Sequence, residues 1–504
     1  MTLPLPEYDQ LDGLAMADLV HRREITPTEL AEAALARMAA RNPALNAIVR
    51  PLEAMAREMA QALEAALKAS PDHHAPFVGV PMVIKDMLAN IANVPTSFGN
   101  HRLQQIVAPD DSELVARYRR AGAVFIGKSN TPEFGLTPFT ESEALGPAHN
   151  PWDTGKTTGG SSGGSGAAVA ARIVPIGHGG DGGGSIRIPA SCNGVFGLKP
   201  SRGRMPTGPV FGDSWRGFVQ EHVLTISVRD SAAMLDATAG EDIGTPVACP
   251  RQERPYLDEV QRDPEPLRIA VTTTPFFGKD VHPDCIAALD DAATLLSSLG
   301  HHVERAEPVV NGAALARAFL TIVAGECRAD IAWLGQQLGR RPRMDDVEVS
   351  TWALGLVGRS LSAGDYASAA RELQMAGRVV GRFHERYDLL LTPTLAAPPF
   401  TIGALQPTAL ERAALSVIGR FGLGNALRAA GMLDDIVDKV YAFMPYTALF
   451  NVTGQPAMSV PLYWNATGLP IGTQMVARFG DEATLFQVAG QLERARPWAA
   501  RVPF

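Results

Sequence analysis

Cysteine is scarce in this chain, and so are apolar runs long enough to cross a membrane. Only 4 of its 504 residues are cysteine, and they lack the spacing of a disulfide framework or a zinc site. Such cysteines are typical of a reducing compartment, and the first residues lack the apolar segment of a secretory signal. No run of about 20 apolar residues occurs, so no membrane span is expected. These absences predict a cytoplasmic protein without a membrane partner.

Positive charge is also in short supply. Lys and Arg number 45 against 53 Asp and Glu, which gives a formal net charge of −8, and the chain has no basic run. No nucleic-acid partner is therefore expected, because binding to phosphates needs a basic surface. Hydrophobic residues make up 46% of the chain and charged residues 19%, a composition that supports a large core. The composition is that of a globular protein.

Helix and strand patterns alternate along the chain. The run Thr26-Pro27-Thr28-Glu29 is a capping box with proline at the first helical position, and it predicts a helix through about Arg41. Further helices are predicted at about 52–69, 111–120, 165–171 and 283–299, and strands at 78–84, 123–127, 267–271 and 302–304. This alternation predicts an α/β fold, with a large, mixed, twisted sheet flanked on both faces by helices.

Glycine, by contrast, is abundant at 48 residues, and it gathers around two serines. Ser161 and Ser185 lie in separate glycine-rich turns within residues 159–201. Glycines let backbone N–H groups crowd around a reacting atom where a Cβ would obstruct them. A serine in such a turn is placed to attack a carbonyl while backbone amides hold the oxyanion. The amides expected to form this oxyanion hole are those of Gly182, Gly183, Gly184 and Ser185.

A lysine at the end of an apolar run is the candidate base. Val83 and Ile84 precede Lys85, and burial lowers the pKa of a lysine by up to several units, which leaves a neutral amine. Ser161 is then placed to relay a proton between this amine and Ser185. His178 is the weaker candidate, because a histidine base needs an orienting acid of its own.

Three other motifs indicate different chemistry, and their context argues against each. Residues 159–163 satisfy the G-x-S-x-G pattern of a nucleophile elbow, but the polar segment before them is not the buried strand that an elbow must follow. Residues 122–129 satisfy the P-loop pattern, but the residues between the glycines are typical of a strand. His301 and His302 with Glu304 suggest a metal, but strand alternation sends the two imidazoles to opposite faces. No metal and no cofactor are expected.

Six segments in order resemble the amidase signature family over roughly residues 10–500. They are 79–86 (GVPMVIKD), 130–134 (NTPEF), 159–165 (GGSSGGS), 181–189 (DGGGSIRIP), 391–394 (LTPT) and 451–457 (NVTGQPA). The resemblance implies one α/β/α domain over residues 1–504, with its core motifs at 79–201, that hydrolyses an amide bond in a small-molecule substrate. In one departure, Gly180 stands where the family usually has threonine.

The resemblance also implies roles for individual residues. Ser185 would be the nucleophile of an acyl-enzyme, Ser161 the bridging serine, and Lys85 the base. The Gly160–Ser161 peptide bond would be cis. Asp181 and Arg187 would support the oxyanion loop without carrying protons.

Substrate choice should depend on two variable segments, at about residues 205–218 and 313–444. Their apolar candidates for a pocket are Phe211, Trp215, Phe218, Phe319, Trp333, Trp352, Leu356, Phe421 and Met432. The motif spacing resembles that of the nylon-oligomer amidases of the family, the 6-aminohexanoate cyclic-dimer hydrolases. These place a substrate-contacting cysteine in the region of Cys327, although a buried inert cysteine is the alternative. A linear or cyclic amide such as a nylon-type oligomer is thus the expected substrate.

Other functions remain open on the sequence alone. The same triad would serve a carbamate, aryl-ester or anilide hydrolase, and it would also serve the glutaminase subunit of a tRNA-dependent amidotransferase, which needs a partner chain. A silent binding scaffold is disfavoured because all three triad residues are present. A homodimer is an open alternative to a chain that acts alone.

Overall fold

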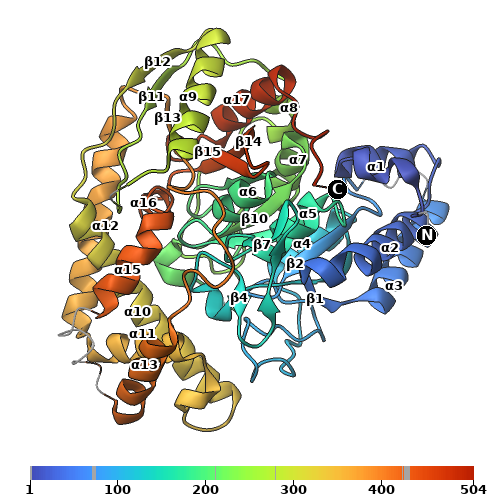
Figure 1. Ribbon diagram of the computed structural model, residues 1–504. Coiled ribbons are helices and arrows are strands. Elements are labelled where there is room, and N and C mark those ends of the chain that lie inside the picture. The colour runs from blue at the N-terminus through green and yellow to red at the C-terminus, as the bar shows by residue number, and fades with distance from the viewer. Residues whose placement is uncertain are drawn as a thin grey trace.

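One large sheet runs through the molecule, as the computed structural model in Figure 1 shows. The structure describes residues 3–70, 75–210, 212–278, 280–422, 424 and 432–503. Its 11 strands follow the order β1-β3-β2-β8-β10-β9-β14-β15-β13-β11-β12. Their bounds are β1 Ile48–Pro51, β2 Pro81–Lys85, β3 Val124–Ser129, β8 Ile176–Asp181, β9 Phe196–Lys199, β10 Gln220–Thr225, β11 Arg268–Val271, β12 His302–Arg305, β13 Leu389–Pro393, β14 Ala457–Trp464 and β15 Pro470–Ala477. The β3-β2-β8 and β13-β11-β12 stretches are parallel, whereas β1 pairs with β3 antiparallel and the central strands pair antiparallel, so the sheet is mixed, as predicted.

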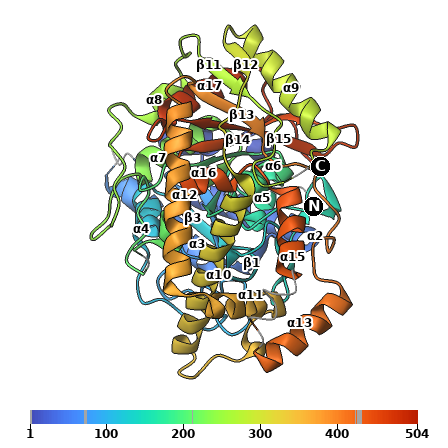
Figure 2. The same ribbon diagram turned by 90° about the vertical axis from the view of Figure 1, so that its left-hand side faces the viewer.

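Helices cover both faces of this sheet, which also agrees with the prediction (Figures 1 and 2). The helices are α1 Gly13–His21, α2 Pro27–Leu45, α3 Glu53–Ala69, α4 Glu113–Arg120, α5 Gly163–Ala170, α6 Arg187–Asn193, α7 Val228–Thr238, α8 Tyr256–Val260, α9 Pro283–Ser298, α10 Gly312–Gln337, α11 Val349–Ser360, α12 Ala363–Phe383, α13 Ala409–Phe421, α15 Met432–Phe443, α16 Ala448–Thr453 and α17 Glu482–Ala495. Short strands β4 Glu141–Ser142, β5 Gly146–Pro147, β6 His149–Asn150 and β7 Asp153–Thr157 form two small ribbons. Among the described residues, no helix is both long and apolar enough to cross a membrane.

Local sequence accounts for several of these boundaries. Thr26 caps α2, with Glu29 bonding back to its backbone, so the capping box is confirmed. The helix continues to Leu45, beyond the predicted end near Arg41, and closes on Asn46 in the left-handed conformation. The residues that satisfy the P-loop pattern form the buried strand β3 and not a phosphate-binding loop, as their apolar character predicted.

Helix α5 brings the first serine turn into the core. It begins at Gly163, two residues before the predicted start, and all of its residues are buried. A Cβ at Gly164 would lie 2.3 Å from the backbone nitrogen of Asn130, so glycine permits this close approach. Ser161 and Ser162 are therefore held at the N-terminal end of a buried helix.

Helices of the C-terminal half pack on one another in a separate layer. It consists of α10, α11, α12, α13 and α15, all from the predicted variable segment 313–444, and α10 packs on both α11 and α12. In Figure 1 these helices stand together, yellow to orange-red, on the side of the molecule opposite the blue helices of the N-terminal segment. The layer and the sheet together enclose the candidate site.

Candidate active site

Lys85 is the last residue of β2 and is almost fully buried, with a relative exposure of 1%. Its Nζ lies 2.7 Å from Ser161 Oγ and 3.1 Å from Ser162 Oγ, both within hydrogen-bonding distance. Burial lowers the pKa of Lys85 to about 7, against the opposing charges of Glu221 and Asp181. A lysine with this pKa is largely neutral just above pH 7, so its amine is able to accept a proton from Ser161.

The loop before α5 places Ser161 against that amine. Its Gly160–Ser161 peptide bond is cis, as the resemblance implies. Gly160 packs so closely on Phe139 that a Cβ would lie 2.6 Å from the Phe139 backbone. The N–H of Ser162 donates to the carbonyl oxygen of Ser185 at 3.2 Å, which joins the two serine loops. The lysine strand and both serine turns therefore meet at one place.

His178, the alternative base, lies on the backbone side of Lys85. Its Nδ1 accepts a hydrogen bond from the Lys85 N–H at 3.3 Å, and its Nε2 lies 3.1 Å from Glu221 Oε1. Burial lowers the pKa of His178, which favours the neutral ring. Since Nδ1 is an acceptor here, the proton of that ring is on Nε2. His178 thus orients the end of the strand that carries Lys85.

The second serine turn is shaped by Asp181, the last residue of β8. The N–H of Gly184 donates to Asp181 Oδ1 at 2.8 Å, and the N–H of Ile186 donates to Oδ2 at 3.1 Å. Gly184 has a φ of 135°, and a Cβ there would lie 2.4 Å from Thr447 Oγ1. Only glycine fits this position, for reasons of both conformation and space.

The same contact corrects the expected set of oxyanion donors. Gly184 was expected to donate its N–H to the oxyanion, but that group already donates to Asp181. The remaining candidate donors are the N–H groups of Gly182, Gly183 and Ser185.

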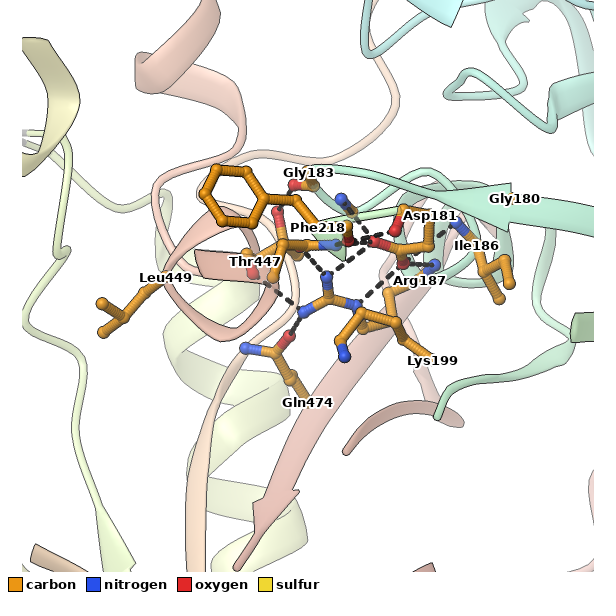
Figure 3. Close-up of polar contacts among 12 residues, drawn as sticks. Gly180, Asp181, Gly183, Ile186, Arg187, Lys199, Phe218, Thr447, Leu449 and Gln474 are labelled. Atoms are coloured by element: carbon orange, nitrogen blue, oxygen red, sulfur yellow. Dashed lines mark hydrogen bonds and ion pairs between the residues drawn. The ribbon is translucent and has the colours of Figure 1, made fainter. Parts of the chain in front are cut away.

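Arg187 holds Asp181 from below in a buried network (Figure 3). Its Nε donates to Asp181 Oδ2 at 2.9 Å and its Nη2 to Oδ1 at 2.8 Å. The guanidinium also donates to the Thr447 carbonyl at 3.0 Å, to Gln474 Oε1 at 2.7 Å and to Asn451 Oδ1 at 2.6 Å. Burial would raise the pKa of Asp181, but the charge and hydrogen bonds of Arg187 lower it to about 2. Both side chains are thus engaged in holding the loop.

Ser185 opens onto a cavity of about 210 Å³. Its walls come from the NTPEF turn, the oxyanion loop and the helical layer, and they are largely apolar. Apolar members of the wall include Leu136, Phe139, Ile188, Trp215, Phe319, Val323, Leu354 and Met444. With Ser185 at one side and apolar surface around it, this cavity is the place for a substrate.

The predicted pocket residues divide between the cavity wall and the surrounding core. Trp215 and Phe319 line the cavity, and Phe218 stacks on Phe319 with ring centroids 6.1 Å apart. Leu356 is buried in a helical core cluster, and Phe421 is 70% exposed. Both variable segments therefore contribute to the site, but only some of their apolar residues do.

The other predicted pocket residues lie elsewhere. Trp333 packs on Phe98 with ring centroids 5.3 Å apart, and Trp352 donates to the Gly419 carbonyl. Phe211 and the side chain of Met432 lie outside the described residues.

Cys327, on α10, is fully buried and packs with Phe134 and Ile331. Its Sγ lies 3.5 Å from the carbonyl oxygen of Thr351, a residue of the cavity wall. Among the described residues that line the cavity, Thr351 is present and Cys327 is not. The thiol therefore lies one layer behind the wall, and substitution of Cys327 decides whether it contacts a substrate.

Carboxyl groups in the cavity wall are the part of the site that the sequence reasoning missed. Glu133, Glu141 and Glu348 line the cavity, and burial raises the pKa of Glu133 to about 7 and that of Glu348 to about 8. Glu133 accepts from Asn100 Nδ2 at 2.7 Å and from the N–H of Glu348 at 2.8 Å. The one available signal was Glu133 within the NTPEF motif, because Glu348 comes from a distant part of the chain.

The possible metal ligands His301 and His302 lie on opposite sides of their strand end. His301 is buried and its Nε2 lies 2.8 Å from Gln491 Oε1, whereas His302 is exposed. In the portions of the chain that the structure describes, no group of three or more His, Cys, Asp or Glu side chains is placed to hold a metal ion.

Comparison with known proteins identifies relatives along nearly the whole chain. The family model described as Amidase matches residues 29–486. The 6-aminohexanoate-cyclic-dimer hydrolases of Pseudomonas sp. (strain NK87) and Paenarthrobacter ureafaciens are each 38% identical over 499 residues, covering 98% of this chain and 96% of theirs. A solved structure of a 6-aminohexanoate cyclic dimer hydrolase complexed with substrate matches with a TM-score of 0.88 and 36% identity, covering 98% of this chain and 99% of that one.

Proposed function

The chain belongs to the amidase signature family and is a hydrolase of carbon–nitrogen bonds, and on that premise we propose that it cleaves a carboxylic amide through an acyl-enzyme on Ser185. One observation carries this proposal: the buried Lys85 amine lies 2.7 Å from Ser161 Oγ, in a loop that touches the Ser185 loop. The lowered pKa of Lys85 makes the amine a base near neutral pH.

The proposed reaction begins with proton transfer along this chain of groups. Ser185 Oγ attacks the amide carbon while its proton passes to Ser161 and the Ser161 proton passes to the Lys85 amine. The developing oxyanion accepts hydrogen bonds from the backbone N–H groups of Gly182, Gly183 and Ser185.

The intermediate then collapses in two stages. The carbon–nitrogen bond breaks, and the proton held by Lys85 returns through Ser161 to the leaving amine, which leaves an ester on Ser185. Water then attacks this ester with the same relay acting as base, and the carboxylic acid is released. Asp181 and Arg187 act in the proposal only by holding the loop.

We propose a linear or cyclic amide, such as a nylon-type oligomer, as the substrate. The support is twofold: the largely apolar cavity wall suits methylene segments, and two relatives at 38% identity are named for hydrolysis of the 6-aminohexanoate cyclic dimer.

The test uses the purified chain on linear amides, cyclic amides, carbamates, aryl esters and anilides. We expect cyclic or linear amides to give the highest kcat/KM, a covalent acyl adduct on Ser185 by mass spectrometry, and loss of turnover in Ser185→Ala. Ser297→Ala, which removes a hydroxyl from the surface of α9, is the matched control.

Three results would contradict the proposal. Near-normal kcat in Ser185→Ala together with an inactive Ser161→Ala would support the elbow mechanism instead. Carbamates or esters as the best substrates would move the enzyme to that class. Activity only after a partner chain is added would indicate the amidotransferase subunit.

A further inference from the structure

A second cavity adjoins the one at Ser185. This outer groove encloses about 1110 Å³ and runs beside the N-terminal part of α10, with Ala313 and Arg317 on one wall and Ala442 of α15 on another. It shares four lining residues with the Ser185 cavity: Leu320, Glu411, Lys439 and Tyr441. The two spaces are therefore separated by one layer of side chains.

An ion pair forms the polar part of that layer. Lys439 Nζ lies 2.7 Å from Glu411 Oε1, which connects α15 with the first turn of α13. Glu411 is also held by its capping box with Thr408, whereas Lys439 approaches it on a long, partly exposed side chain. Both side chains are partly exposed, and such a pair contributes little to stability. A chain passing between the two spaces would displace it at low cost.

The sizes of the two spaces indicate what occupies them. Pockets that enclose a drug-sized ligand measure roughly 300–1,000 Å³. The volume of the Ser185 cavity, about 210 Å³, is below this range, whereas the volume of the outer groove, about 1110 Å³, is above it. A substrate longer than one short amide unit would have to continue beyond the Ser185 cavity, and the groove adjoins it.

The walls of the groove fit a chain of alternating apolar and amide segments. Phe276, Phe277 and Val281 supply apolar surface, while Arg317 and Asp280 supply charged side chains of both signs. Apolar surface suits methylene runs, and dispersed polar groups suit amide N–H and C=O groups.

We propose that the outer groove is an extended subsite for the part of a linear oligoamide remote from the scissile bond. This inference rests on the proposed amidase function. The preferred substrates would then be linear oligoamides of several amide units, and the affinity of the enzyme for them would increase with the length of the oligoamide.

The experiment measures kcat/KM for end-capped linear amides of one to four ω-aminoacyl units, with N-methylhexanamide as the short substrate. In the unmodified enzyme we expect kcat/KM to rise roughly tenfold or more from the one-unit to the three-unit substrate. Ala313→Trp and Ala442→Trp fill the groove from different walls at exposed positions, so both should abolish that rise and leave the short substrate unaffected. Ala329→Trp, at an exposed position farther along α10, is the control and should keep the rise.

Binding separates failure of the groove from failure of the proposed chemistry. Calorimetry with Ser185→Ala should show affinity for the oligoamides that increases with length, and adding Ala313→Trp should remove the increase. The subsite proposal would be overturned if kcat/KM of the unmodified enzyme did not rise with substrate length. It would also be overturned if Ala313→Trp and Ala442→Trp both kept the same rise as the unmodified enzyme. If no amide were turned over, the proposed function would fail, and the same binding series would still decide the groove.

Discussion

Replacing Lys85 by methionine should stabilise the fold near neutral pH while abolishing activity. The ordinary pKa of lysine is 10.5, and burial lowers the pKa of Lys85 to about 7 in the folded chain. At a pH between these two pKa values, the Lys85 amine is protonated in the unfolded chain and neutral in the folded chain. The free energy of unfolding therefore increases with pH across this window, and below it the fold bears the full cost of a protonated, buried amine.

The magnitude follows from the two pKa values. At about 1.36 kcal/mol per pKa unit, the cost is about 4 kcal/mol at pH 7 and about 2 kcal/mol at pH 9. Methionine removes this cost, but it also removes the contacts of Lys85 with Ser161 and Ser162, worth about 1 kcal/mol each. Lys85→Met should then be about 2 kcal/mol more stable than the unmodified protein at pH 7, with almost no difference at pH 9.

Urea denaturation at pH 6, 7, 8 and 9 measures this difference, and the same samples give the pH dependence of kcat/KM. In the unmodified enzyme kcat/KM should rise with pH through about 7 and then level off, as the Lys85 amine loses its proton. Lys85→Arg should be as inactive as Lys85→Met, because a guanidinium does not act as a base. A stability difference that does not change with pH, or an active Lys85→Arg, would refute the neutral base.

Three further substitutions test the loop and the wall. Gly184→Ala should lower kcat by roughly a hundredfold or more, because its Cβ would lie 2.4 Å from Thr447 Oγ1 and shift the loop; normal kcat would show that the loop tolerates a side chain. Arg187→Met should lower the free energy of unfolding by about 3–5 kcal/mol in urea, since it leaves the Asp181 carboxylate buried without its partner; a loss below 1 kcal/mol would contradict that pairing. Cys327→Ala should lower the free energy of unfolding by about 1 kcal/mol and leave the ranking of amide substrates unchanged, because the thiol lies behind the wall. A changed ranking at unchanged stability would instead place Cys327 at the substrate.

The sequence by itself determined the parts of this protein that depend on short stretches of chain. The capping box at Thr26 predicted the start of α2, and the apolar runs at 78–84 and 123–127 predicted β2 and β3. The glycine-rich turns around Ser161 and Ser185 marked the candidate site in the same way. These predictions were possible because hydrophobic period, caps and glycine conformations act within a few residues.

Tertiary structure alone decided the relations between distant segments. The imidazole of His178 accepts from the Lys85 backbone N–H, and Glu133 meets Glu348 in the cavity wall. The position of Cys327 behind the wall likewise follows from the packing of α10 on α11. Side-chain direction and burial at such contacts arise from packing between elements far apart in sequence, where no local pattern records which groups will meet.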